Sequence, residues 1–393
     1  MIFLPVISEK VYNTSVSILA AGTMKIAFFH NLNFGGAKRV VFEQVKSLST
    51  RHKVDVYKTN LDDDIFDPVE YAENIYKYEI PFRFSSDPKL HRLEYDLKTL
   101  FTLQRKHEQI AREIDSRNYD IVLVHPDKFT QAPFLTRYLK TKSVYYCQEP
   151  LRIAYEYSLR LRDKVSPVKK GYEEVSRYLR KRNDRINVRS ASYSLASCLH
   201  IRERMIESYD VYPDINYPGI DTTLFRPKTR KKKNQLLFIG GKDVVTDGYD
   251  LLKSAVMLLP SISRPEIKIV TWKKQNNQRL TDEELIDLYN DSLAAMCMSR
   301  LETFGLVPLE AMACGVPVIA TNISGHRETI VHGKTGYLVE FHPHEIAEYL
   351  LEIISNPRLA KAMGEEGVRH VKKNWTWKKS TDVLEKLLLS YEK

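Results

Sequence analysis

The stretch from Glu302 to Ala320, ETFGLVPLEAMACGVPVIA, constrains the fold of this chain more than any other segment. Its residue pattern predicts a short helix over residues 306–313, which begins after Gly305 and ends before Gly315. Residues 317–320 then read as a buried strand, because they are apolar and follow a glycine turn. The stretch therefore predicts a loop, a helix and a strand in immediate succession.

Two carboxylates lie close to the start of this predicted helix. Glu302 falls on the loop before it, and Glu310 falls within its first two turns. A helix N-terminus has unpaired N–H groups and the positive end of the macrodipole, so the turn at 304–307 can cradle an anion such as phosphate. Carboxylates beside it can accept hydrogen bonds from hydroxyls, and phosphate with several hydroxyls describes a sugar nucleotide. Two solvated acids at a helix start would give the same short pattern.

Three further motifs accompany this stretch: LTDEELIDLYNDS at 280–292, SGHRETIVHGKTGYLV at 324–339 and YPGIDTTLFRP at 217–227. Together the four closely resemble the C-terminal half of the family 4 retaining glycosyltransferases. That family has the α/β GT-B architecture, in which two Rossmann-like domains face each other across a central cleft. The resemblance implies a metal-independent hexosyltransferase, such as a mannosyl- or glucosyltransferase. Such an enzyme would move a sugar with retention from a nucleotide-sugar donor to a hydroxyl on a glycan or lipid-linked acceptor.

A chain of 393 residues with 43% hydrophobic content is long enough for two domains with separate cores. We expect residues 1–23 to be an extension, because Met24 opens the first apolar strand. Residues 24–227 would form the acceptor-side domain and residues 228–374 the donor-binding domain, with the basic linker RPKTRKKKN between them. Residues 375–393 would form a helix that crosses back to the first domain.

The cysteines are scattered singly along the chain, which argues against a disulfide framework and a zinc site. No apolar run is long enough to span a bilayer. We therefore expect a cytoplasmic protein, in part peripheral on the cytoplasmic membrane face, with no metal and no cofactor besides the donor substrate. Asp62 and Asp64 form an Asp-x-Asp, which binds a metal in the other large glycosyltransferase architecture. Nothing else resembles that architecture, so a solvated loop is expected there.

The first domain opens with a strand over 25–30, a turn at Gly35 and Gly36, and a helix over 39–48. This order is the opening of a dinucleotide-type domain, although the sequence is not a GxGxxG. A tight turn without a ligand would have the same sequence. The family resemblance implies that Gly36 lets this loop approach the donor phosphates.

Two strands of the first domain end next to polar side chains that can contact an acceptor. One strand is predicted to end at His125, and the next is followed by Gln148 and Glu149. Ligands of open α/β sheets lie beyond the carboxyl ends of strands. Relatives in the family often have histidine at the position of Gln148, close to the reacting centre. Glutamine cannot take up a proton, so His125 either serves instead or is a packed residue.

The second domain begins with a strand, a glycine turn and a helix over 236–259, the geometry of a phosphate site. Family members place an arginine and a lysine here on the donor diphosphate, where this chain has Gly241 or Lys242, and Asp247. That exchange weakens electrostatic stabilisation of the leaving group. The resemblance implies that Glu302 faces the donor sugar and that Glu310 binds the ribose. The full set of expected donor-binding residues is Gly36, Gly240, Gly241, Lys242, Thr303, Phe304, Gly305, Leu306 and Glu310.

Two segments leave the donor base and the role of a basic helix open. Only KKQNNQR separates the strand at 266–272 from the next helix, so one strand–helix unit is missing and the donor base cannot be predicted from the sequence.

Residues 151–190 hold twelve Lys or Arg and five Asp or Glu. In this segment Tyr172, Val175, Tyr178 or Leu179 and Ile186 recur at helical spacing, which fits a helix on an anionic membrane surface or one that packs on its own domain. Nucleic acid is not expected, because no recognition motif accompanies the charge. The alternative function is a sugar-nucleotide-binding or scaffold protein with weakened catalysis.

Overall fold

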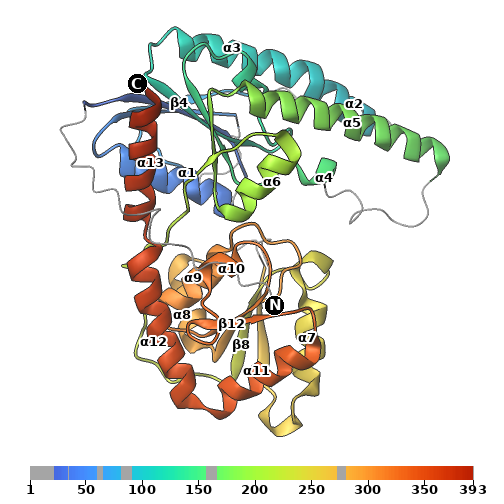
Figure 1. Cartoon of the computed structure of the whole chain (residues 1–393), viewed down its shortest axis with the longest axis vertical. Helices are drawn as coiled ribbons and strands as arrows, with labels where there is room; N and C mark the ends of the chain where they lie inside the picture. Colours follow the sequence, from blue (N-terminus) through green and yellow to red (C-terminus); the bar gives the residue numbers. More distant parts are fainter. Residues whose placement is uncertain are drawn as a thin grey trace.

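The computed structural model describes residues 22–33, 35–59, 65–80, 91–155, 166–271 and 280–392. Its strands form two parallel sheets, one of seven strands and one of five, which occupy separate halves of the molecule (Figure 1). Helices lie on both faces of each sheet, so central strands such as β4, β5, β10 and β11 are buried throughout, whereas the edge strands β3, β7 and β9 keep exposed residues. Asp62 and Asp64, for which a solvated loop is expected, fall outside the described residues, as do residues 1–21.

The first sheet has the strand order β3-β2-β1-β4-β5-β6-β7. Its strands are β1 (Lys25–Asn31), β2 (Lys53–Lys58), β3 (Asn74–Lys77), β4 (Ile121–Asp127), β5 (Ser143–Cys147), β6 (Tyr193–Ala196) and β7 (Asp214–Ile215). The order reverses between β1 and β4, where successive connections leave to opposite sides. A reversal of this kind opens a crevice at the carboxyl ends of the two strands.

The helices of the first half cover this sheet above and below. They are α1 (Gly36–Leu48), α2 (His91–Lys98), α3 (Gln104–Asp115), α4 (Arg152–Tyr155), α5 (Pro167–Ser190) and α6 (Leu199–Tyr209), with a π-helical turn (Thr99–Leu103) between α2 and α3. The longest of them, α5, begins at a serine cap with proline in its first turn. It extends beyond the body of the sheet in Figure 1.

The second sheet has the order β12-β11-β10-β8-β9 and reverses between β8 and β10. Its strands are β8 (Gln235–Ile239), β9 (Glu266–Val270), β10 (Ala294–Cys297), β11 (Val318–Thr321) and β12 (Gly336–Val339). The surrounding helices are α7 (Tyr249–Leu258), α8 (Asp282–Asp291), α9 (Leu306–Ala313), α10 (His326–Thr329), α11 (Pro343–Ser355) and α12 (Pro357–Asn374). The edge strand β9 leads to α8 through residues 272–279, which lie outside the described residues.

The last helix, α13 (Trp377–Glu392), returns to the first sheet, where it packs beside α1 (Figure 1). Glu385 forms an ion pair with Arg51 at 2.7 Å and contacts the His52 ring at 3.0 Å. The two crossings between the halves touch each other, because Ile220 N donates to Trp375 O at 2.7 Å. A Cβ on Gly219 would lie 2.3 Å from the backbone of this second crossing. The halves are therefore joined by two backbone segments in direct contact.

Among the described helices, none combines the length and the apolar character that a membrane span requires. The four cysteines are free and buried.

Candidate functional site

A cavity of about 1480 Å³ lies between the two sheets. Its walls come from the carboxyl ends of β1, β4, β5 and β9, from the first turns of α1 and α9, and from one face of α8. Both sheets thus direct strand-end loops towards the same space, the first sheet those at its topological switch point between β1 and β4. This volume is large enough for a small-molecule ligand with more than one chemical group.

The start of α9 supplies an anion site on the floor of this cavity. Gly305 has φ 87°, in the left-handed region that glycine adopts without strain, and no side chain caps the helix. A Cβ at Gly305 would also lie 3.0 Å from the ring of His326. Both the turn and the close packing require glycine, and together they expose the first N–H groups of α9 to the cavity.

The other loop residues predicted to bind the donor have different surroundings. Thr303 lines the cavity, and its carbonyl accepts a hydrogen bond from Gly325 N at 3.1 Å. The Phe304 ring packs against Tyr217 and Trp375, with ring centroids 6.1 and 5.7 Å away. These ring contacts hold the loop in place, so Phe304 positions the residues of this loop that line the cavity.

Glu302 lines the cavity and is half-buried. Its Oε1 accepts a hydrogen bond from the backbone N–H of Thr303 at 3.0 Å. This local bond holds the carboxylate against its own loop and satisfies one of its oxygens. Glu302 therefore presents a positioned negative charge beside the start of α9.

Glu310 is buried, and both of its oxygens have partners. Tyr289 Oη donates to Oε2 at 2.9 Å, and Arg39 Nη1 donates to Oε1 at 3.1 Å from the opposite half of the molecule. Burial raises the pKa of Glu310, and the charge of Arg39 and the Tyr289 hydrogen bond oppose that rise. Arg39 also lies 3.6 Å from Asp282 and 5.1 Å from the Phe225 ring. In this conformation Glu310, which is expected to bind the ribose, instead accepts a hydrogen bond from Arg39 of the other half.

Gly36 lies opposite the start of α9. A Cβ on Gly36 would be 3.3 Å from Leu306 Cδ1, so the N-termini of α1 and α9 meet at the cavity. Two helix N-termini that converge in this way favour a multiply charged anion more than either does alone.

The glycine turn after β8 does not contribute to this cavity. Gly241 N donates to Asp247 Oδ2 at 2.8 Å, and a Cβ on Gly240 would lie 3.1 Å from the same carboxylate. Lys242 is exposed. Asp247 thus occupies the backbone amide that a phosphate would use. Among the described residues, the cations that line the cavity are Arg39, Lys128 and Lys268.

Gln148, which was predicted to face the acceptor, lines the cavity, and its Nε2 donates to Ala37 O at 3.1 Å. His125 does not line the cavity. The strand β4 continues to Asp127, so His125 lies inside the sheet, stacked between Phe28 and Tyr146 at 5.9 and 5.1 Å. The predicted strand end at His125 was therefore wrong by two residues. Burial lowers the pKa of His125 far below its usual value, so the ring is neutral and lies behind Gln148, 3.4 Å away.

Asp127 is a residue of this site that the sequence did not single out. It ends β4 at the cavity, is fully buried, and accepts hydrogen bonds from Asn31 Nδ2 at 2.6 Å and Phe129 N at 2.7 Å. Burial raises its pKa to about 6. The only sequence signal was a polar side chain two positions after His125, on the same face of the strand.

Glu328 joins the two halves of the molecule through hydrogen bonds. Its carboxylate accepts hydrogen bonds from the N–H groups of Leu199 at 2.9 Å and His200 at 3.0 Å, and from Tyr217 Oη at 2.8 Å. The first two bonds cap the N-terminus of α6, which has no cap of its own. An acid of the second half therefore completes a helix of the first.

Residues 274–370 match the family model described as Glycosyl transferases group 1. A D-inositol 3-phosphate glycosyltransferase of Rhodococcus jostii is 39% identical over 221 residues, and the match covers 46% of this chain and 49% of that relative. One of Thermobifida fusca is 28% identical over 206 residues, 43% of this chain and 47% of that relative. The chain thus spans about half the length of the curated relatives it matches.

Solved structures resemble this chain over nearly its whole length. The Anabaena protein HepE in complex with UDP and glucose has a TM-score of 0.68 at 16% identity, covering 93% of this chain and 99% of that one. WaaG, a glycosyltransferase involved in lipopolysaccharide biosynthesis, has a TM-score of 0.61 at 17% identity, with coverage of 91% and 99%. At these identities the likeness shows the fold, and the predicted GT-B architecture is confirmed.

Proposed function

Because residues 274–370 of this GT-B chain belong to the Glycosyl transferases group 1 family, we propose that the protein is a retaining glycosyltransferase. It transfers a hexose, such as mannose or glucose, from a nucleotide-sugar donor to a hydroxyl of a glycan or lipid-linked acceptor, without a metal ion. One neighbour of this fold was solved in complex with UDP-glucose, which supports a UDP-sugar as the first donor to test.

The convergence of α1 and α9 at one cavity, with two carboxylates beside it, is the observation that carries this proposal. The diphosphate would lie at the N–H groups of Gly305 and Leu306, with Gly36 close to it from the other half. Glu302 would face the donor sugar, and Glu310 would accept hydrogen bonds from the ribose hydroxyls. The acceptor would approach from the side of Gln148.

Donor binding requires Glu310 to exchange Arg39 for hydroxyl groups. In the structure the Arg39 guanidinium lies between Glu310 and Asp282 and is 8% exposed. Once released from Glu310, Arg39 remains beside the start of α9 and can balance the charge of the diphosphate. Lys242 is exposed and does not line the cavity. Arg39 would thus replace the cations that the glycine turn after β8 lacks.

A binding protein with weakened catalysis is the second candidate. The observation that favours it is Asp247, which occupies the Gly241 amide and has a negative charge where the family resemblance expects a lysine for the diphosphate. Gln148, unable to take up a proton, fits the same function. For either candidate we propose a cytoplasmic location, which agrees with four free cysteines.

A thermal-shift screen with UDP-, GDP- and ADP-sugars tests the proposed function. A ligand that binds only the folded state at about 100 times its Kd stabilises the protein by about 2.7 kcal/mol, so one nucleotide series should raise the midpoint clearly. Transfer of labelled sugar from that donor then separates the transferase from the binding protein. The proposal fails if no nucleotide sugar shifts the midpoint, or if the shift is the same for inorganic sulfate.

A further inference from the structure

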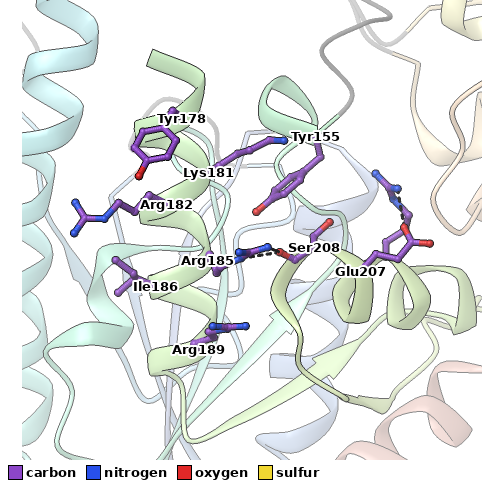
Figure 2. A pocket seen from close by; sticks show the side chains of 10 residues that line it. Tyr155, Tyr178, Lys181, Arg182, Arg185, Ile186, Arg189, Glu207 and Ser208 are labelled. Carbon is purple, nitrogen blue, oxygen red and sulfur yellow. Dashed lines mark hydrogen bonds and ion pairs between the residues drawn. The ribbon is translucent and has the colours of Figure 1, made fainter. Parts of the chain in front are cut away.

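A second cavity lies between α5 and α6, on a different surface of the first half, and has a volume of about 640 Å³ (Figure 2). It is lined by Tyr155, Tyr178, Lys181, Arg182, Arg185, Ile186, Arg189, Arg204, Glu207 and Ser208. Five of these residues are cations and one is an acid. The acid, Glu207, is engaged by Arg204 at 3.1 Å, so it does not neutralise the other four.

The helix α5 separates its charges between its two sides. On the side towards α2, Arg180 forms an ion pair with Asp96, which also accepts a hydrogen bond from Tyr172 Oη at 2.7 Å. On the side towards α6, Lys181 and Arg185 point into the cavity in Figure 2. Asp96 therefore neutralises Arg180 inside the domain and Asp210 pairs with Arg189 at 3.0 Å, whereas the charges of Lys181 and Arg185 are directed into the cavity.

Two of the cavity arginines are held in place by the C-terminal end of α6. Arg185 donates from Nε and Nη2 to Ser208 O at 3.1 and 2.9 Å, as the dashed lines of Figure 2 show. Arg189 donates from Nε to Tyr209 O at 2.6 Å. Both guanidinium groups are thus fixed before a ligand arrives, which lowers the entropy cost of binding.

The inner wall of the cavity contains further groups suited to an anion. Lys181 Nζ lies 5.1 Å from the centre of the Tyr155 ring. The hydroxyl of Tyr155 is buried and has no hydrogen-bond partner within the described parts of the chain. Burial lowers the pKa of Lys181, and the positive charges of Arg177 and Arg185 lower it further. A bound anion would relieve this repulsion and give the hydroxyl an acceptor.

We propose that the α5–α6 cavity binds a phosphate monoester group through Lys181, Arg204 and the fixed guanidinium of Arg185. Arginine forks match phosphate oxygens, and lysine adds a point charge. The phosphate belongs either to a soluble metabolite or to a lipid headgroup. This site is separate from the cleft and does not depend on the proposed glycosyl transfer.

The exposed face of α5 indicates which of these two sources could supply the phosphate. Val175 is 61% exposed and Tyr178 is 66% exposed, although both belong to the apolar spacing expected to pack inward or on a membrane. Of that set, Tyr172 faces inward through its bond to Asp96. An apolar stripe next to a phosphate site is the arrangement of a helix at a lipid surface.

Two probes distinguish the sources. Glycerol 3-phosphate is titrated by calorimetry, and phosphatidylcholine vesicles with and without phosphatidic acid are tested by co-sedimentation. The cavity variant is Lys181→Gln/Arg204→Gln, with one change on each wall. Its matched control is Lys169→Gln/Lys170→Gln, which removes the same charge from exposed positions in the first turn of α5.

We expect wild-type protein and control to bind, and the cavity variant to bind at least about tenfold more weakly while it keeps the wild-type melting curve. Binding of glycerol 3-phosphate identifies a phosphate group as sufficient, whereas binding of phosphatidic acid vesicles alone identifies a lipid headgroup. The proposal is overturned if wild-type protein binds neither probe. It is also overturned if the control loses as much affinity as the cavity variant, since net charge alone would then explain binding.

Discussion

Replacement of Glu302 by glutamine is expected to lower kcat for sugar transfer by about 10²–10³-fold, with little change in donor affinity. In the proposed reaction, positive charge develops on the sugar as its bond to the diphosphate breaks, and a fixed carboxylate beside it stabilises that charge. Glutamine keeps the volume of Glu302, and its amide oxygen can still accept the Thr303 N–H bond. The variant therefore removes the charge and preserves the loop.

The measurement is the initial rate of labelled-sugar transfer at saturating donor. Glu283→Gln is the matched control, because Glu283 is an exposed acid in the first turn of α8 and does not line the cavity. It should retain the wild-type rate. An unchanged rate in Glu302→Gln would exclude an electrostatic role for this carboxylate.

Glu310→Ala is expected to weaken nucleotide-sugar binding by about 100-fold and to lower the free energy of unfolding by about 3–5 kcal/mol. The first effect follows from the loss of two hydrogen bonds between ribose hydroxyls and a charged acceptor. The second follows because Arg39, 8% exposed, loses the buried carboxylate at 3.1 Å and keeps Asp282, at 3.6 Å, as its acidic partner among the described residues. Calorimetric titration measures the first effect and urea unfolding the second.

Two companion variants make this prediction specific. Glu283→Ala should change neither quantity, because that side chain is exposed. Arg39→Ala/Glu310→Ala should be more stable than Glu310→Ala, since the double variant leaves no buried charge unpaired. If the double variant is less stable than Glu310→Ala, the cross-domain ion pair is not the source of the lost stability.

The elements around the site could be predicted because their signals are local. Helix α9 spans residues 306–313, as the apolar pattern between two glycines predicted, and the following strand lies within one residue of its expected start. The order of strand, glycine turn and helix at the start of each half was likewise correct. Such elements depend on residues within one or two turns of one another. The exact domain boundaries stay a prediction.

The ion pair of Arg39 and Glu310 could not be predicted, because its partners are 271 positions apart and meet only when two sheets adopt one orientation. The cap of α6 by Glu328 has the same cause. Local patterns carry no information about how two domains face each other. For the same reason, the sequence placed Lys242 at the diphosphate, whereas in the structure it is exposed.

His125 illustrates a smaller kind of error. The hydrophobic run DIVLVH predicted a strand that ends at His125. The strand instead continues to Asp127, so a histidine expected at the cleft lies within the sheet and an aspartate reaches the cavity. Residues two positions apart point to the same face of a strand. The side chain that reaches the cavity is therefore Asp127 in place of His125.

The position of a bound donor tests the central claim most directly. We propose a crystal structure of the wild-type protein with the nucleotide sugar that gives the largest thermal shift. The diphosphate should lie at the N–H groups of Gly305 and Leu306, with the ribose on Glu310 and Arg39 displaced from that carboxylate. A nucleotide bound outside this cavity, with the Arg39–Glu310 pair intact, would contradict the account.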